Sequence, residues 1–549
     1  MKTALALAVA AFLATSTAPA MCWAAPAELV IWGGPVYTGA KTAKAEAVAV
    51  FGGRIAYVGT RAGAKAQVGP KTQIIDLKGA ALFPGFTDSH AHLREIGNRE
   101  LSLNLEGSKS AAEASGRVKA YLAAHPGTGP VWGRGWIETG WPEGRFLRKG
   151  DIDPISSGRP VLLTRADGHA LVANSAALKA AGIDIATAAP AGGTIERGAD
   201  QQPTGILIDN AMSLVAKLKY VPTEADRRAE FDAAFKVEAA YGWTGIHSMS
   251  VSWDDVLLLE TLDAEGKTPL RVYNAVEGVE AGPLFASGPR ATKDGRITTR
   301  AIKLYEDGAL GSRGALLFEP YADAPGSNGL QLTPLPVMRE AMKKAKAAGI
   351  QVATHAIGDR GNATVLDLYE QVAPAGGRWR IEHSQIIRPV DIPRFAKGGV
   401  IASMQPSHAI GDFHFAPSRL GEARLAGAYA WQSVLKSGGV VVGGSDSPVE
   451  RGDALIEFYA AVARKDLQGF SAPNWHPEEA LTREQALKLF TSSAAYARFA
   501  EAELGTIEVG KRADLSGFSV DLMTVPETAI PKAHAVLTIV DGKVVYRVP

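Results

Sequence analysis

Short apolar segments alternate with amphipathic segments through the second half of the chain, and this alternation limits the fold more than any other feature. Most apolar segments have glycine close by, which is typical of strands buried on both faces. They span residues 297–304, 350–354, 379–382, 400–404 and 440–443. Residues 336–348 and 482–499 are rich in Ala, Lys and Glu and favour helix, and Thr482 with Gln485 is spaced as a capping box. The alternation predicts a parallel sheet or an α/β barrel.

Both ends of the chain differ from this middle part. Each contains short strand-like segments separated by turn signals, such as Gly52-Gly53 near the start and Asp541-Gly542 near the end. The segments are residues 29–32, 47–50, 54–58, 513–515, 535–540 and 543–546. We predict that the two ends, residues 26–83 and 497–549, pair into one small β-sandwich.

With 549 residues, the chain is too long for one core of ordinary size. Residues 84–496 are assigned to the barrel. Within them, residues 101–221 carry many Gly, Pro and Trp residues and fit no strand and helix alternation. We interpret this part as a lid-like insertion over the barrel mouth. Without it, roughly 290 residues remain, close to the roughly 250 of a typical (β/α)8 TIM barrel.

The first 25 residues have the pattern of a secretory signal peptide. A short positive start is followed by an unbroken apolar segment over residues 4–13 and then by small residues. The apolar segment is short for a membrane span. Two alternatives are an uncleaved N-terminal anchor and a lipid anchor on Cys22, and the bulky Met21 before Cys22 disfavours the second.

Cys22 is the only cysteine in the chain. Cleavage after Ala24 or Ala25 leaves a mature protein without cysteine, so no disulfide forms despite the export signal. This combination predicts a bacterial periplasmic or secreted protein with no membrane span after cleavage. It also restricts any metal site to His, carboxylate or modified Lys.

Charge and composition exclude some classes of partner. The net charge is +1, and 46% of residues are hydrophobic and 21% charged, which is ordinary for a soluble globular protein. A nearly balanced charge without a basic patch does not favour nucleic acid or an anionic membrane surface. A small molecule is the expected partner.

Two histidines follow an apolar segment at residues 82–93. His90 and His92 lie at positions i and i+2, so on a strand their side chains point to the same side. Two imidazoles there can chelate one divalent ion. Taken alone, the pair also occurs by chance in structural roles, but the preceding residues Pro84 to Asp88 strengthen the interpretation as metal ligands.

Three more donors follow strand-like segments. His355 and His383 each end one, and Asp446 follows residues 440–443. Alternatively, each histidine is a satisfied polar residue and Asp446 caps a helix. Because strand carboxyl ends surround the functional mouth of a barrel, we expect all three to face the space near His90.

Lys303 lies inside an apolar strand-like segment. Burying a charged amine is costly unless the amine is paired or deprotonated. A neutral amine can add carbon dioxide to form a carbamate, which has two oxygens for bridging two metal ions. The alternative is an ion pair with Asp446 or Glu306.

This set, in this order, resembles the amidohydrolase superfamily. The surrounding sequence resembles the amidohydrolase-3 group of YtcJ-like enzymes, which includes N-substituted formamide deformylases. The resemblance runs from about Glu28 to the C-terminus, and its most specific segments are residues 84–93, 141–145, 167–169 with 174–175, 305–313, 355–359 and 403–408.

The resemblance implies a TIM barrel with a β-sandwich and a site for one or two Zn²⁺ ions. His90 and His92 are implied as ligands of one ion, and His355 and His383 as ligands of the other. N6-carboxylysine at Lys303 is implied as the bridge. Asp446 is implied as both ligand and general base for hydrolysis of a C–N bond.

Four further residues are predicted on the substrate side: His169 and His408 as catalytic groups, and Arg313 and Trp136 as substrate contacts. Each also has a structural interpretation, and Trp136 in particular is suited to core packing. A homodimer is implied only by the resemblance. The rival functions are a deaminase or cyclic-amide hydrolase on the same scaffold, and a periplasmic binding protein without catalysis.

Overall fold

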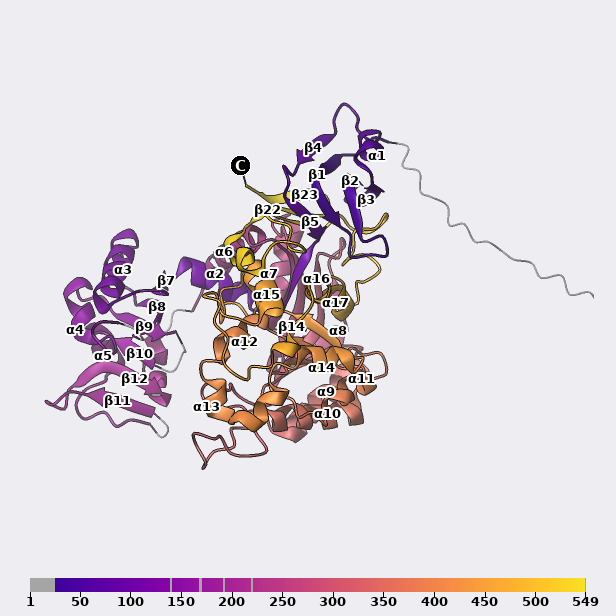
Figure 1. The fold of residues 1–549 in the computed structure, drawn as a ribbon. Coiled ribbons are helices and arrows are strands. Elements are labelled where there is room, and N and C mark those ends of the chain that lie inside the picture. Colours follow the sequence, from indigo (N-terminus) through magenta and orange to yellow (C-terminus); the bar gives the residue numbers. More distant parts are fainter. Residues whose placement is uncertain (1–24, 139–140, 167–169, 191–192, 219–220, 549) are drawn as a thin grey trace, which may run out of the picture.

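The computed structural model describes residues 25–138, 141–166, 170–190, 193–218 and 221–548. The signal peptide predicted for residues 1–25, with Cys22, falls almost wholly outside these ranges. Figure 1 shows three regions: a sheet built from both chain ends, a barrel, and an insertion on one side of the barrel. The α/β barrel predicted from the alternation is confirmed.

The two chain ends share one eight-stranded sheet. They meet where β5 pairs antiparallel with β21, and Leu82 lies opposite Gly517. Alternation along the strands gives each face a core: Leu29 and Ile31 pack with Leu515 and other residues of the C-terminal end, whereas Val30 packs on the opposite face. The strands are β1 (Leu29–Tyr37), β2 (Lys44–Phe51), β3 (Arg54–Gly59), β4 (Gln73–Asp76), β5 (Ala81–Pro84), β21 (Leu515–Phe518), β22 (Ala535–Val540) and β23 (Lys543–Arg547), and α1 (Arg61–Lys65) follows β3.

Eight parallel strands form the barrel, in the order β20-β19-β18-β17-β16-β14-β13-β6. They are β6 (Phe86–Ala91), β13 (Trp243–Val251), β14 (Arg271–Glu277), β16 (Ile297–Tyr305), β17 (Gln351–Ala356), β18 (Arg380–His383), β19 (Ile401–Met404) and β20 (Val440–Gly443), and β15 (Arg290–Ala291) pairs with β16. The first and last strands meet at their carboxyl ends, where Asp446 N donates to His90 O at 2.7 Å and His92 N donates to Ser447 O at 2.8 Å. This contact brings the two ends of the predicted ligand set together.

Helices surround the barrel: α2 (Leu93–Leu101), α6 (Glu224–Ala240), α7 (Trp253–Ala264), α8 (Gly282–Ser287), α9 (Leu335–Ala347), α10 (Asp359–Val372), α11 (Ile392–Gly398), α12 (Pro406–Asp412), α13 (Ala416–Leu420), α14 (Trp431–Lys436), α15 (Ala454–Ala463), α16 (Arg483–Phe490) and α17 (Ser492–Ala497). The helix predicted over residues 482–499 is present but is divided at Thr491 into α16 and α17. The Thr482 and Gln485 capping box begins α16, but Thr491 breaks the helix because its backbone is not helical and its hydroxyl donates to Leu487 O at 2.5 Å.

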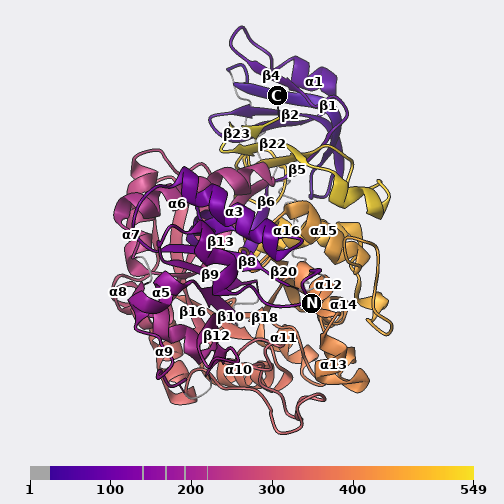
Figure 2. The ribbon, with the colours of Figure 1, turned by 90° about the vertical axis from the view of Figure 1, so that its left-hand side faces the viewer.

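The insertion is a domain with its own sheet, ordered β11-β12-β10-β9-β8-β7. Its elements are β7 (Leu103–Asn104), α3 (Ala111–Ala124), β8 (Val131–Trp136), α4 (Lys149–Ile152), β9 (Val161–Arg165), β10 (Ala170–Ala173), α5 (Ser175–Ala181), β11 (Gly193–Arg197) and β12 (Pro203–Asp209). Apolar cores lie against this sheet. The chain enters the insertion from the carboxyl end of β6 through α2, and Figure 2 shows the insertion in front of the barrel.

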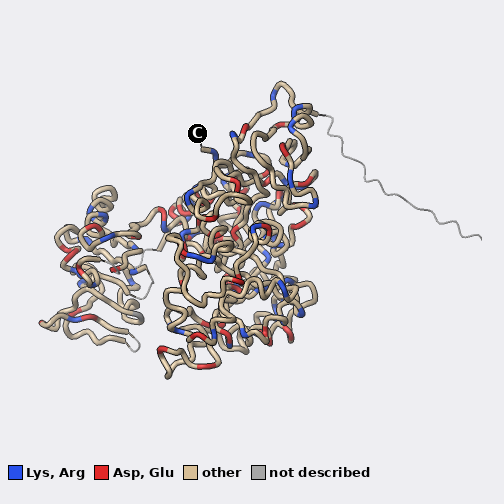
Figure 3. Tube along the Cα trace, viewed as in Figure 1, with Lys and Arg blue, Asp and Glu red and all other residues tan. Residues whose placement is uncertain are grey.

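Acidic and basic residues are mixed along the chain in all three regions (Figure 3). Among the helices described, none combines the length and the apolar character that crossing a membrane would require.

Candidate metal centre

The six predicted ligands come from six positions at or near the carboxyl ends of barrel strands. His90 lies on β6 and His92 follows it, Lys303 lies on β16, His355 on β17, His383 ends β18, and Asp446 follows β20. Parallel strands present their carboxyl ends at one edge, so these positions converge although they span most of the chain. The structure brings all six together.

Asp446 lies at the centre of the group. Its Oδ1 is 3.3 Å from His90 Nε2 and 3.2 Å from His92 Nε2, and its Oδ2 is 4.0 Å from His383 Nδ1. One donor atom from each of His90, His383 and Asp446 lies within 4.8 Å of the others, which is the spacing of ligands around one ion. Burial acts to raise the pKa of Asp446, but His90 and His92 outweigh it and hold that pKa well below its usual value.

Lys303 is 1% exposed, and its Nζ lies 3.5 Å from His90 Nε2. Neither of the ion pairs considered from the sequence, with Asp446 or Glu306, is formed within 4 Å in the described chain. Burial lowers the pKa of the amine, which favours its neutral form. The amine therefore lies among imidazoles and carboxylates without a close counterion.

His355 and His383 lie side by side, with ring centroids 4.5 Å apart. His355 Nε2 is 3.6 Å from Asp307 Oδ1. Burial lowers the pKa of His355 to about 3 and the pKa of His383 well below its usual value. Both rings are therefore neutral at physiological pH, the form in which imidazole binds a metal.

Sequence reasoning missed the acidic partner of His90. Glu382 Oε2 lies 2.6 Å from His90 Nδ1, and Arg380 donates to both oxygens of the same carboxylate at 2.7 and 2.9 Å. All three side chains are fully buried. A carboxylate on one ring nitrogen fixes the tautomer and directs the other nitrogen toward the metal. Two charged residues at i and i+2 of a strand buried on both faces were the signal in the sequence.

Two glutamines orient two further histidines. Gln405 Oε1 lies 2.8 Å from His383 Nδ1, and Gln385 Nε2 lies 3.0 Å from His408 Nδ1. His408 stacks on His383 with ring centroids 5.9 Å apart, and its Nε2 is 3.7 Å from Asp446 Oδ2. No hydrogen-bond partner in the described chain reaches His408 Nε2. That nitrogen is available to a substrate.

Two residues of the candidate metal centre have a strained backbone. His383 has φ +72° and Asp446 has φ +60°, in the left-handed region that residues other than glycine rarely adopt. Such a conformation costs roughly 1–3 kcal/mol and persists where the surroundings enforce it. Asp88 helps to enforce it, since its carboxylate accepts hydrogen bonds from Ser445 N at 3.0 Å and Ser445 Oγ at 2.6 Å.

The donor set fits a divalent metal of borderline softness. Four imidazoles, one carboxylate and one buried amine offer nitrogen and oxygen atoms without thiolate, which suits zinc and its neighbours better than calcium or magnesium. Glu382 and Gln405 supply the outer contacts that metal-binding histidines ordinarily have.

Of the other predicted substrate-side residues, His169 lies outside the described residues. Arg313 forms an ion pair with Asp323 at 2.9 Å, and its side chain is 39% exposed. Trp136 requires a correction: its side chain is fully buried in the core of the insertion against Trp141. Simple alternation along β8 would place Trp136 on the face of Trp132 and Arg134, but the pairing register shifts at Gly135, which has φ +97°, and this irregularity turns Trp136 into the same core as Val131.

A parallel barrel with a histidine, lysine and aspartate cluster at its strand ends defines the class of metal-dependent barrel hydrolases. Residues 73–546 match the family model described as "Amidohydrolase family", and the chain belongs to that family. It is 35% identical to the "Putative amidohydrolase YtcJ" of Bacillus subtilis (strain 168), with 94% of this chain and 99% of the relative covered.

Two other comparisons bear on the site. The chain is 28% identical to the "N-substituted formamide deformylase" of Arthrobacter pascens, over 92% of this chain and 96% of that protein. The solved structure of an uncharacterized metal-dependent hydrolase from Pyrococcus horikoshii OT3 superimposes with a TM-score of 0.76 and 28% identity. The superposition covers 91% of this chain and 99% of the other. The predicted family is confirmed, and the substrate is not defined by these similarities.

Proposed function

We propose that this chain hydrolyses a C–N bond of a small molecule, an amide, N-acyl amine or N-formyl amine. One observation carries the proposal: donor atoms of His90, His383 and Asp446 converge within 4.8 Å. They do so at the barrel mouth, the end at which barrel enzymes carry their active sites. The 28% identity to an N-substituted formamide deformylase supports an N-formyl or N-acyl substrate.

His90, His92, His355, His383 and Asp446 would hold one or two Zn²⁺ ions. A bound Zn²⁺ polarises a carbonyl group and lowers the pKa of a bound water to about 7. The family membership and the donor set support this assignment.

Asp446 acts as the general base. It accepts a proton from the attacking water and returns that proton to the leaving nitrogen as the C–N bond breaks. Its position within 3.3 Å of two imidazoles keeps it ionised, so the carboxylate is in the form that can accept a proton. His408, whose Nε2 has no partner in the described chain, donates a hydrogen bond to the carbonyl oxygen as negative charge develops there.

Lys303, once carboxylated, would offer two carbamate oxygens as further metal ligands. Its neutral amine adds carbon dioxide and releases a proton, which converts a buried amine into a two-oxygen anion. Its burial, which favours the neutral amine, and the 3.5 Å separation between its Nζ and His90 Nε2 support this proposal.

The first experiment measures metal in the purified full-length chain by atomic spectroscopy and screens N-formyl amines, N-acyl amines and dipeptides for release of amine and acid. We expect bound zinc and turnover of at least one class, and loss of turnover in Asp446→Ala. Bound metal with no turnover of any C–N substrate would contradict the proposal and favour a binding protein. Ammonia release from aminated heterocycles would indicate a deaminase instead.

We also propose export to the periplasm or the medium and formation of a homodimer. The apolar segment at residues 4–13 supports the first, and the second follows only from the family resemblance. N-terminal sequencing of the protein from a culture supernatant or periplasmic extract, and light scattering of the purified protein, test the two statements.

A further inference from the structure

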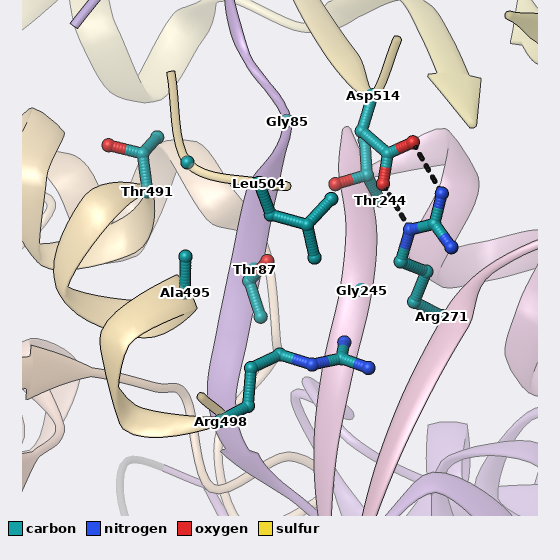
Figure 4. A pocket seen from close by; sticks show the side chains of 11 residues that line it. Gly85, Thr87, Thr244, Gly245, Arg271, Thr491, Ala495, Arg498, Leu504 and Asp514 are labelled. Carbon is teal, nitrogen blue, oxygen red and sulfur yellow. Dashed lines mark hydrogen bonds and ion pairs between the residues drawn. The ribbon is translucent and has the colours of Figure 1, made fainter. Parts of the chain in front are cut away.

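A small cavity lies at the amino end of the barrel, at the opposite end of the strands from the metal ligands. It is lined by residues of the first barrel strands, the segment around α17 and the start of β21: Gly85, Thr87, Thr244, Gly245, Arg271, Thr491, Ala495, Arg498, Leu504, Gly505 and Asp514. Figure 4 shows the cavity and the side chains that line it. The volume of about 10 Å³ gives room for one occupant about the size of a water molecule.

Arg498 is the unusual member of this lining. It follows α17 directly and is 6% exposed. In Figure 4 its side chain reaches across β6 toward Gly245 of β13. In the described part of the chain, its Nη1 has no hydrogen-bond partner and no carboxylate lies within 4 Å of its guanidinium. A buried guanidinium without a counterion is strongly unfavourable.

The neighbouring arginine has the opposite arrangement. Arg271 donates to both oxygens of Asp514, at 2.5 and 3.0 Å, and also contacts Asp541. Asp514 Oδ1 additionally accepts from Asp541 N at 2.9 Å. Asp514 is therefore occupied by Arg271 and does not neutralise Arg498. Among the residues that line the cavity, two guanidiniums face one carboxylate, and Asp541, outside the lining, is shared by Arg271, Arg296 and Arg512.

The hydroxyl groups of the lining differ in what they can donate. Thr244 Oγ1 donates to Phe86 O at 3.0 Å, and Thr491 Oγ1 donates to Leu487 O at 2.5 Å. The hydroxyl of Thr87 has no such acceptor among the described residues. The cavity thus offers one uncommitted hydroxyl and one uncommitted guanidinium as donors.

From these observations we propose that the cavity binds a single monovalent inorganic anion, chloride under physiological conditions, held by Arg498 and Thr87. A guanidinium without a carboxylate within 4 Å in the described chain, uncommitted donors and a volume for one small occupant fit a halide and exclude a phosphate or an organic acid. Burial beside Arg271 lowers the pKa of Arg498 to about 10, which leaves it charged at neutral pH. The anion links β6, which carries His90, to the segment after α17.

Bromide tests the site directly because it replaces chloride and scatters X-rays anomalously. Crystals of the full-length protein grown or soaked in sodium bromide should show an anomalous peak beside Arg498, and Arg498→Met crystals should show none. Wild-type density that holds only a water, with no anomalous signal, would overturn the proposal. The wild-type crystals alone test the proposal, even if Arg498→Met does not fold.

Thermal unfolding in solution gives a second readout. At constant ionic strength, replacing gluconate with chloride should raise the midpoint of the wild-type protein saturably, by about 2 °C. Arg498→Met should lose this dependence. Arg300→Met is the matched control, since Arg300 lies over the Phe499 ring at 3.9 Å and does not line the cavity. An equal chloride effect in Arg498→Met and the wild type would contradict the assignment.

Discussion

The metal centre and the Arg271 network lie at opposite ends of one barrel and use buried charge in opposite ways, while Arg498 beside the second has no carboxylate within 4 Å in the described chain. At the carboxyl end, His90, Lys303 and Asp446 converge with incomplete pairing and strained backbone. At the amino end, Arg271 is paired with Asp514 and Asp541, and this network joins the barrel to the sheet of the chain ends. Leaving buried charges without full partners costs folding free energy, and an active site accepts this cost because its groups must bind metal or substrate. Full pairing of buried charges instead fixes the position of one domain on another.

The comparison predicts that changes at the carboxyl end alter activity and changes at the amino end alter stability. Asp446→Asn removes the carboxylate that we propose as general base and metal ligand but keeps the shape of the side chain. We expect kcat/KM for the substrate found in the screen to fall by about 10²–10⁴-fold, with little change in the thermal midpoint. Asp254→Asn, at a side chain 78% exposed, is the control and should retain activity. Comparable activity in both variants would contradict the assigned role.

Arg271→Met tests the amino end. It leaves the carboxylate of Asp514 buried without its partner, and removing one member of such a pair costs roughly 3–5 kcal/mol of unfolding free energy. Chemical denaturation measures that loss, and kcat/KM per folded molecule should not change. Lys236→Met is the control, because its ion pair with Asp232 is exposed and worth roughly 0–1 kcal/mol. Equal stability of the two variants would remove the distinction between the barrel ends.

Gln405→Leu sharpens the comparison within the metal centre. Gln405 contacts the metal-ligand candidate His383, whereas Gln385 contacts His408, which is not assigned as a ligand. Loss of an outer contact to a ligand should weaken zinc binding by about 10–100-fold in Gln405→Leu. Gln385→Leu should leave zinc affinity unchanged. Competition with a chromogenic chelator measures both, and an equal loss in the two variants would indicate a general packing effect.

The last prediction concerns Glu306, a buried acid next to the centre. Burial raises its pKa from 4.5 to about 7, so the folded protein holds the proton more tightly than the unfolded chain does. The resulting stabilisation is present below pH 4.5 and is lost as the pH rises through 7. Relative to Glu306→Gln, the wild type should lose roughly 3 kcal/mol of unfolding free energy over that interval, at about 1.4 kcal/mol per unit of pKa change.

Unfolding measured at several pH values between 4 and 8 gives this difference. The exposed Glu484→Gln is the control and should follow the wild type throughout. A constant difference between wild type and Glu306→Gln at all pH values would show that Glu306 does not titrate in this interval.

Much of this architecture was predictable from the sequence because it depends on local patterns. Segments such as residues 350–354 and 400–404 have the length and apolar character of buried strands, and they are β17 and β19. The capping box at Thr482 begins α16 as expected. The division of this helix at Thr491 does not show in the residue composition, because it depends on the hydroxyl of Thr491 bonding to the preceding turn.

The metal-ligand candidates were predictable from the sequence, but the residues that hydrogen-bond to them were less so. Histidine and aspartate that follow buried strands can be recognised as ligand candidates, because parallel strands end at a common edge. The partner of His90 is Glu382, and the two are 292 positions apart, so no local pattern connects them. An aromatic residue in the insertion suits a pocket as well as a core, and the register shift at Gly135 of β8 places Trp136 in the core.

The sequence by itself determined the fold class, the family and six side chains that meet at the barrel mouth, since strand length, residue type and order along the chain encode them. The tertiary structure decided which charges are paired. Arg271 and Arg498 are both buried arginines near the same cavity, yet one has two carboxylates and the other has none within 4 Å in the described chain. Pairing depends on distances between side chains from separate elements, and those distances exist only once the barrel has closed.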